Sequence, residues 1–182
     1  MPEITQVRLS GFGGQGIVLA GILLGEAGVI DGKYVAGSDS YGAQARGSSC
    51  QSEVVFSDGP IDFPLLTTED ILIAMSQGAY DMFCEDVRKK SGLILFDQYQ
   101  VRPKEGFDVI QIGIPATEYA LKRLKNRQVT NIILLGALIE TTKIVSLKAI
   151  KKAIHTHVSG RLRSLNLKAL GMGIELGRRV HG

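Results

Sequence analysis

The chain has 182 residues, which is enough for one domain with a full hydrophobic core. It is 45% hydrophobic and 21% charged, as is ordinary for a globular protein, and its lack of Trp argues against a stacking platform for single-stranded nucleic acid. The net charge of +3 is unevenly spread: residues 122–182 hold 13 Lys and Arg against 2 Asp and Glu, whereas residues 1–121 hold 8 against 16. A cationic final third indicates either an anionic partner or a solvated face.

The sequence predicts neither a membrane span nor a signal peptide. The longest apolar run, Ile17 to Ile30, is shorter than the ~18–20 residues that cross a bilayer, and it contains Glu26. The first residues lack a basic stretch followed by an apolar one, so we expect a cytoplasmic protein. Cys50 and Cys84 are too few to hold an iron–sulfur cluster, which is held by four thiolates, so any electron carriers are expected on other chains.

The N-terminal segment predicts a strand, a glycine-rich loop and a helix. An apolar strand is expected over Gln6–Ser10, and a helix over residues 15–31, closed by Gly32. The glycine loop, residues 11–16, reads Gly-Phe-Gly-Gly-Gln-Gly and fits the pattern G-x-G-x-x-G. Its glycines permit a sharp turn and close approach, and the first N–H groups of the following helix attract anions, so the loop is a candidate phosphate cradle. The alternative is a tight turn whose glycines serve packing alone.

A second glycine-rich stretch follows the next predicted strand, Lys33–Gly37. We expect this strand to pair in parallel with the first through a right-handed crossover. The stretch covers residues 38–49, and its candidate binding residues are Ser40, Tyr41, Arg46 and Gly47. Ligands bind at the carboxyl edge of open α/β sheets, so we expect both glycine-rich segments to meet there. Arg46 can grip a carboxylate or phosphate with its planar fork.

The rest of the chain alternates predicted strands and helices. The further strands are expected over residues 51–57, 71–76, 92–97 and 108–114, and the further helices over residues 79–90, 115–125, 132–139, 147–158 and 166–180. Ser146 is expected to cap the helix that begins at residue 147. The helix that Asn131 is expected to cap is apolar on all sides and therefore buried. In the last helix, Gly173 and Gly177 share a face, which indicates close approach of another backbone. Without linker or repeat, residues 1–182 predict a single α/β domain: a mostly parallel central sheet flanked by helices, with a helical C-terminal third.

Two motifs in this order and spacing, residues 11–16 and the Ser-Tyr-Gly-Ala-Gln-Ala-Arg-Gly of residues 40–47, together resemble the gamma subunit of 2-oxoacid:ferredoxin oxidoreductases of the 2-oxoglutarate/pyruvate type. Residues 70–77 and 130–137 also resemble that family, so the resemblance covers nearly the whole chain. The family pattern commonly reads S-Y-G-P-x-x-R-G-G, from which Ala43 and Ser48 depart. The form found here is closest to the 2-oxoglutarate-type enzymes, and the departures leave the 2-oxoacid open.

The resemblance implies a division of labour within a complex. The complex decarboxylates a 2-oxoacid oxidatively, transfers the acyl unit to coenzyme A and passes electrons to ferredoxin. Thiamine diphosphate and iron–sulfur clusters belong to partner subunits, so this chain is expected to bind no cofactor alone and to hold no catalytic residue and no metal. The implied partners are the alpha, beta and ferredoxin-like delta subunits, with ferredoxin as acceptor; a homo-oligomer of the isolated chain is left open.

The resemblance also implies that this subunit helps assembly and presents coenzyme A. The expected contacts for coenzyme A or for the catalytic partners are Gly11, Gly13, Gly14, Gln15, Gly16, Ser40, Tyr41, Arg46 and Gly47. The cationic final third would suit the phosphates of coenzyme A. His155 and His157 lie two apart on a predicted helix and face different directions, so they do not predict a shared metal site.

Two other functions stay open at this point. A self-contained NAD(P)-binding domain would use the same G-x-G-x-x-G with Asp39, 23 residues after Gly16, near the place of a ribose-binding acid. Against it, Gly14 is an additional glycine and Asp39 is expected to open a polar loop. A nucleic-acid-binding module would use the basic final third, but the sequence has no helix-turn-helix, RRM or zinc-finger pattern, so no nucleic-acid partner is expected.

Overall fold

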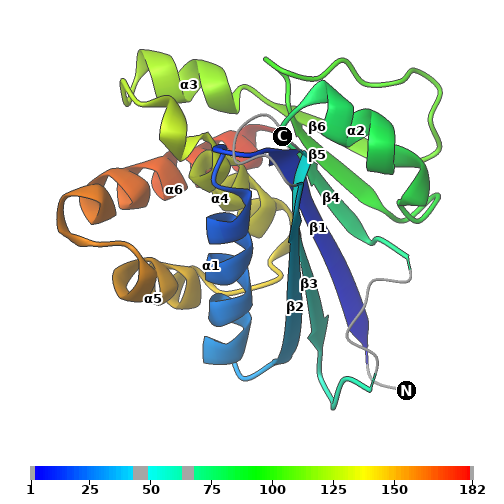
Figure 1. The fold of residues 1–182 in the computed structure, drawn as a ribbon, viewed down its shortest axis with the longest axis horizontal. Coiled ribbons are helices and arrows are strands. Elements are labelled where there is room, and N and C mark those ends of the chain that lie inside the picture. The colour runs from blue at the N-terminus through cyan, green and yellow to red at the C-terminus, as the bar shows by residue number, and fades with distance from the viewer. Residues whose placement is uncertain (1–2, 43–48, 63–67, 181–182) are drawn as a thin grey trace.

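The fold is a six-stranded sheet with helices on both faces (Figure 1). The computed structural model describes residues 3–42, 49–62 and 68–180. The strands are β1 (Ile4–Phe12), β2 (Tyr34–Tyr41), β3 (Ser49–Ser57), β4 (Ile71–Ala74), β5 (Leu93–Asp97) and β6 (Ile110–Ile114). The helices are α1 (Ile17–Ile30), α2 (Gln77–Phe83), α3 (Ala116–Lys122), α4 (Thr130–Thr142), α5 (Leu147–His157) and α6 (Gly160–Val180), with 3₁₀ turns η1 (Cys84–Asp86) and η2 (Arg127–Val129).

The sheet is mostly parallel, as the sequence predicts. The strand order is β2-β3-β1-β4-β5-β6, and β1, β4, β5 and β6 pair in parallel. Among the strands that the structure describes, β3 alone runs against the others, and it pairs antiparallel with both β1 and β2. The expectation that the first two strands pair directly is therefore wrong, because β3 folds back from β2 and inserts between them.

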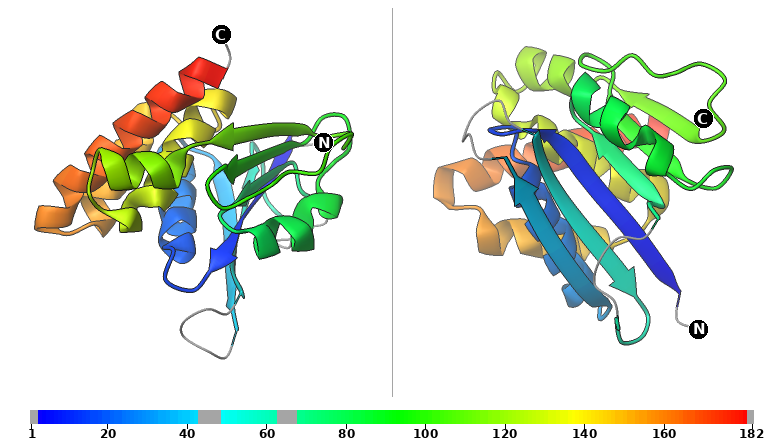
Figure 2. Two further views of the ribbon diagram at one scale, coloured as in Figure 1. Left: turned by 90° about the horizontal axis from the view of Figure 1, so that it is seen from above. Right: turned by 45° about the vertical axis from the view of Figure 1, so that its right-hand side comes forward.

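The helices form two unequal layers. Helices α1, α4, α5 and α6 cover one face of the sheet, and α2 covers part of the other (Figures 1 and 2). Successive strand residues point to opposite faces, so Ile73 joins the larger core under α1 and α4, while Leu72 joins the smaller core under α2. Both cores are built from buried apolar side chains. Within the described residues, no helix combines the length and the apolar character that crossing a membrane requires.

Helices α4 and α6 pack with their backbones in close contact, which confirms the prediction from the glycines of the last helix. A Cβ added to Gly173 would collide with the carbonyl oxygen of Ile133, and one added to Gly177 would lie 3.0 Å from the carbonyl oxygen of Ala137. Residues 132–139 of α4 are buried, as expected. Helix α6 begins at Gly160, six residues before the predicted start, because a polar first turn carries no apolar period to mark it.

The boundaries of α2 and α4 also differ from the prediction. The helix expected over residues 79–90 ends at Phe83 and continues as η1, after which Val87 turns to an extended conformation and forms an isolated parallel bridge with Glu69. The spacing of apolar residues over 79–90 fits a helix, and it fits equally well a turn that buries the same side chains. Asn131 is not the cap of α4, since that helix begins one residue earlier, at Thr130. Ser146 does cap α5, because its hydroxyl accepts a hydrogen bond from the backbone N–H of Ala149 (3.1 Å).

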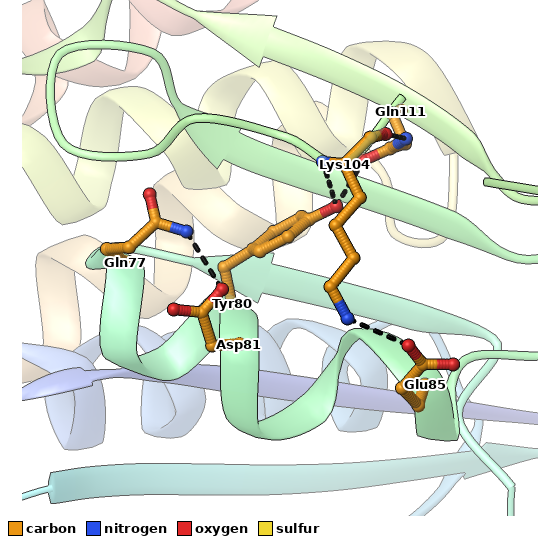
Figure 3. A network of polar contacts seen from close by, with 6 residues as sticks. All are labelled: Gln77, Tyr80, Asp81, Glu85, Lys104 and Gln111. Atoms are coloured by element: carbon orange, nitrogen blue, oxygen red, sulfur yellow. Dashed lines mark hydrogen bonds and ion pairs between the residues drawn. The ribbon is translucent and has the colours of Figure 1, made fainter. Parts of the chain in front are cut away.

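A polar network fastens the long connection between β5 and β6 to α2 (Figure 3). The hydroxyl of Tyr80 accepts a hydrogen bond from the backbone N–H of Lys104 (2.9 Å) and donates one to Oε1 of Gln111 (2.7 Å). The ammonium of Lys104 binds the carboxylate of Glu85 at 2.8 Å. Gln77, at the start of α2, accepts from the backbone N–H of Arg102 (2.7 Å) and so holds the same connection.

Candidate functional site

The glycine loop turns the chain sharply from β1 into α1. Gly14 has φ +94° and Gly16 has φ +74°, a left-handed backbone that favours glycine. The backbone N–H of Gln15 donates to the carbonyl of Phe12 (3.1 Å) and closes the turn. Gly11 still belongs to β1, and its missing Cβ leaves room for the side chain of Gln15. Three of the predicted glycines are therefore required by backbone conformation or space.

The side chain of Gln15 fixes the loop to the neighbouring strand. Its Oε1 accepts a hydrogen bond from the backbone N–H of Phe12 (2.6 Å), and its Nε2 donates to the carbonyl of Met75 (3.0 Å), which directly follows β4. Helix α1 leaves β1 toward one face of the sheet, and α2 leaves β4 toward the other (Figure 2). The loop therefore lies at the point where the sheet switches direction, which is the usual ligand crevice of open α/β sheets.

Asn131 fixes the other end of the loop. Its Nδ2 donates to the carbonyl of Gly16 (2.8 Å), and its Oδ1 accepts from the backbone N–H of Ile132 (2.9 Å). The side chain is buried, and a Cβ on Gly16 would collide with its amide group. The start of α4 is thereby held against the start of α1.

A hollow of about 130 Å³ opens beside the loop at this edge of the sheet. Its lining residues are Gly14, Gln15, Met75, Thr117, Arg127, Gln128 and Thr130. The carboxylate of Asp97, which is fully buried at the end of β5, accepts hydrogen bonds from the backbone N–H of Thr117 (3.2 Å) and from its hydroxyl. The hollow is much smaller than the roughly 300–1,000 Å³ of pockets that enclose whole small-molecule ligands. It therefore accommodates one compact group.

Besides Met75, four of these lining residues were not predicted from the sequence as site residues. Thr117, Arg127, Gln128 and Thr130 follow the glycine loop by more than a hundred residues, and no local pattern links them to it. The available signal was the resemblance at residues 130–137, which begins three residues after Arg127. The fold brings η2 and the start of α4 to the loop.

The second glycine-rich segment leaves the sheet at the same edge. Phe12 at the end of β1 pairs with Ser49, and Tyr41 at the end of β2 pairs with Cys50, so the two strand ends flank the start of β3. Ser40 is exposed, one residue before the end of β2. Arg46, Gly47 and the side chain of Tyr41 lie outside the described residues, and their part in binding stays a prediction.

Asp39 does not occupy the place of a ribose-binding acid. It lies within β2, opposite Ser52 of β3, and does not open a loop as expected. Because β3 separates β2 from β1, two strand spacings, about 10 Å, lie between Asp39 and β1. In dinucleotide-binding domains the strand that carries this acid is the direct neighbour of β1. This displacement and the small hollow both argue against the NAD(P)-binding alternative.

The titratable groups near this edge favour binding over covalent chemistry. Burial, with a smaller contribution from the carboxylate of Asp39, raises the pKa of the Cys50 thiol, which disfavours the reactive thiolate. Arg127 is exposed and forms no ion pair with any residue in the described part of the chain. Searched over residues 3–42, 49–62 and 68–180, the structure has no cluster of three His, Cys, Asp or Glu side chains fit to hold a metal ion.

Comparisons with known proteins give a consistent match over the whole domain. The family described as pyruvate ferredoxin/flavodoxin oxidoreductase matches residues 6–176. The 2-oxoglutarate synthase subunit KorC of Methanocaldococcus jannaschii is 43% identical over 178 residues, which cover 96% of this chain and 95% of that protein.

Two solved structures share the fold. The gamma subunit of a keto/oxoacid ferredoxin oxidoreductase from Geobacter sulfurreducens PCA superposes with a TM-score of 0.85 at 34% identity, covering 96% of this chain and 99% of that one. The 2-oxoglutarate:ferredoxin oxidoreductase of Magnetococcus marinus, solved with 2-oxoglutarate, coenzyme A and succinyl-CoA bound, gives a TM-score of 0.87 at 22% identity. The match covers 97% of this chain and 31% of that one, and shows likeness of fold alone.

Proposed function

Since the chain belongs to the pyruvate ferredoxin/flavodoxin oxidoreductase family, we propose that it is the gamma subunit of a complex that oxidises a 2-oxoacid with coenzyme A and ferredoxin. Relatives of nearly the same length, KorC and the Geobacter gamma subunit, are named as separate subunits. The identity to KorC favours 2-oxoglutarate as the 2-oxoacid.

In this proposal the chain carries no redox centre of its own. Its two cysteines are fewer than the four thiolates of an iron–sulfur cluster, so the clusters and thiamine diphosphate are assigned to the partner subunits. The partners are the alpha, beta and ferredoxin-like delta subunits, and ferredoxin accepts the electrons in the cytoplasm. The chain then contributes to the complex by assembly and by binding.

The binding partner that we propose for the glycine loop is coenzyme A. One observation carries this proposal: the loop lies at the switch point of the sheet, where Gln15 and Asn131 hold it rigidly beside a hollow with one free arginine. Gly13 to Gly16 would form one wall of the site, and residues 40–47 would approach from the end of β2. Chemistry on the acyl unit would take place on partner subunits, and this chain would bind and orient the acceptor.

Purification from the native source tests the assignment. We expect alpha, beta and delta subunits to co-purify and to be identified by mass spectrometry. The complex should reduce ferredoxin when given coenzyme A and a 2-oxoacid, with 2-oxoglutarate preferred over pyruvate. A chain that purifies without such subunits, and quenches NADH fluorescence on titration, would instead support the dinucleotide-binding alternative.

A further inference from the structure

The hollow beside the glycine loop has a marked charge asymmetry. Of its seven lining residues, Arg127 is the one that carries a charge. Its guanidinium has no ion-pair partner among the residues that the structure describes, whereas Lys122, Lys143, Arg178 and Arg179 pair with Glu118, Glu140 or Glu175. An unpaired guanidinium at the mouth of a hollow is free to bind an anion in a bidentate manner.

At Gly14, which also lines the hollow, the wall is bare backbone. A Cβ added to Gly14 would have no atom within 4 Å, so the loop presents its main chain to open space at this point. Gln128, next to Arg127, adds a neutral side-chain amide with two N–H donors. A group that enters the hollow therefore meets a cation, an amide and an uncovered peptide backbone.

Hydrogen bonds fix the arginine-bearing turn before any ligand arrives. The hydroxyl of Thr130 donates to the carbonyl of Arg127 (2.8 Å), and the backbone N–H of Gln128 donates to Oδ1 of Asn126 (2.8 Å). Asn131, one residue farther on, donates to the carbonyl of Gly16 and so ties the start of α4 to the glycine loop. The two walls are thus held at a set separation, and little ordering is needed on binding.

We infer that this hollow binds a single phosphate-type group, with Arg127 as its charged ligand and Gln128 as a neutral donor. The inference rests on the proposed function in one respect: within the complex the phosphate would belong to coenzyme A. The small volume excludes the nucleotide as a whole, so one phosphate enters and the rest of the molecule lies outside. Among the described residues of the sequence-predicted site, none supplies a positive charge to the hollow.

The test is the assembled complex carrying Arg127→Gln. Loss of a charged hydrogen-bond partner should raise the KM for coenzyme A about 10- to 100-fold, while the KM for the 2-oxoacid stays unchanged. Arg127→Lys, which keeps the charge but loses the fork, should give a smaller rise. Arg123→Gln is the matched control, since Arg123 is also exposed and does not line the hollow.

Coenzyme A, dephospho-coenzyme A and inorganic phosphate together identify the group that the hollow binds. If the hollow takes the 3′-phosphate, the wild-type preference for coenzyme A over dephospho-coenzyme A should disappear in Arg127→Gln; if it takes the diphosphate, both KM values should rise together. Inorganic phosphate should compete with coenzyme A in the wild type and no longer in the variant. An assembled Arg127→Gln complex with an unchanged KM for coenzyme A would overturn the inference and leave the proposed function standing. A wild-type preparation without 2-oxoacid oxidation would instead count against the proposed function.

Discussion

The side-chain amide of Asn131 donates a hydrogen bond of 2.8 Å to the carbonyl oxygen of Gly16, a residue 115 positions earlier. The two residues constrain each other, because any Cβ on Gly16 would collide with that amide. The carbonyl of Gly16 also accepts from the backbone N–H of Ala20 (3.0 Å), so it takes part in the first turn of α1. Through this pair, the start of α4 supports both the glycine loop and the helix that follows it.

Replacing Asn131 with alanine should therefore loosen the loop as well as lower stability. Removing a buried amide and its two hydrogen bonds should decrease the free energy of unfolding by about 1–3 kcal/mol. Amide hydrogen exchange at residues 13–18 should become faster. Asn166→Ala is the control, because Asn166 is also buried but bonds to Leu162 within α6. Equal rates of amide hydrogen exchange at residues 13–18 in both variants would show that Asn131 does not stabilise the loop.

The packing of α4 on α6 predicts opposite effects on stability when alanine replaces Gly171 or Gly173. Gly173→Ala should lower the free energy of unfolding by about 1–3 kcal/mol, because its Cβ would collide with backbone atoms of Ile133 that cannot move independently. Gly171→Ala should raise it by about 0.5–1 kcal/mol, because Gly171 faces open space and alanine is the better helix former. Urea denaturation measures both. Similar effects of the two substitutions would contradict the close contact of the helices.

The buried carboxylate of Glu69 should make the free energy of unfolding depend on pH. Glu69 is 1% exposed and pairs with the guanidinium of Arg8, which also contacts Glu53 (3.1 Å) and lies 4.2 Å from the ring centroid of Phe83. Burial raises the pKa of Glu69 from an ordinary value near 4.5 to about 7, although Arg8 opposes the rise. The folded protein therefore holds this proton more tightly than the unfolded chain does.

The sign of the effect follows from proton binding. Between pH 4.5 and 7 the folded state binds more protons at Glu69, so this group stabilises the fold fully below pH 4.5 and loses its contribution as the pH rises to about 7. At 1.36 kcal/mol per pH unit, the loss amounts to at most about 3 kcal/mol. Glu69→Gln should remove this slope in denaturation curves taken from pH 4.5 to 8, whereas Glu105→Gln, at an exposed site, should retain it. A slope that persists in Glu69→Gln would assign the effect to other groups.

The hydroxyl of Tyr80 should contribute to the stability of the fold through its two hydrogen bonds (Figure 3). Tyr80→Phe leaves the backbone N–H of Lys104 and the amide oxygen of Gln111 without their partner at part-buried positions, and the loss of two hydrogen bonds should cost about 1–3 kcal/mol. The connection between β5 and β6 should then be cleaved faster by a protease in native conditions. Tyr99→Phe serves as the control, because Tyr99 is 61% exposed. Unchanged cleavage in Tyr80→Phe would mean that Gln77 holds the connection without it.

Local patterns were enough to predict most of the elements. The apolar strands at β1, β4 and β5, the glycine turn and the capping of α5 by Ser146 follow from spacing and residue type, which act over a few positions. Strand pairing does not follow from them. Residues 49–57 read as a strand in the sequence, but no local signal indicates that they pair antiparallel between β1 and β2, and that pairing decides where Asp39 lies.

The residues of the candidate site, too, could be predicted from the sequence only in part. Gly14, Gly16 and Gln15 could be singled out from the sequence, because the glycine pattern is contiguous. Arg127 and Asn131 could not be joined to them, since their contacts with the loop span more than a hundred residues and depend on how α4 packs. Asn131 has the residue type of a cap, and the structure uses it for a long-range bond to Gly16.

The close backbone contact of α4 and α6 at Gly173 and Gly177 has a consequence for biosynthesis. On the ribosome, the nascent chain completes β1 and the glycine loop early, yet α4 gains its most extensive packing partner, α6, only when Gly173 and Gly177 have emerged from the exit tunnel. Until then the helix that carries Asn131 is packed on one side alone. The first loop to be translated is thus among the last parts of the molecule to mature, and premature termination within α6 would yield a polypeptide whose glycine loop lacks full support from α4.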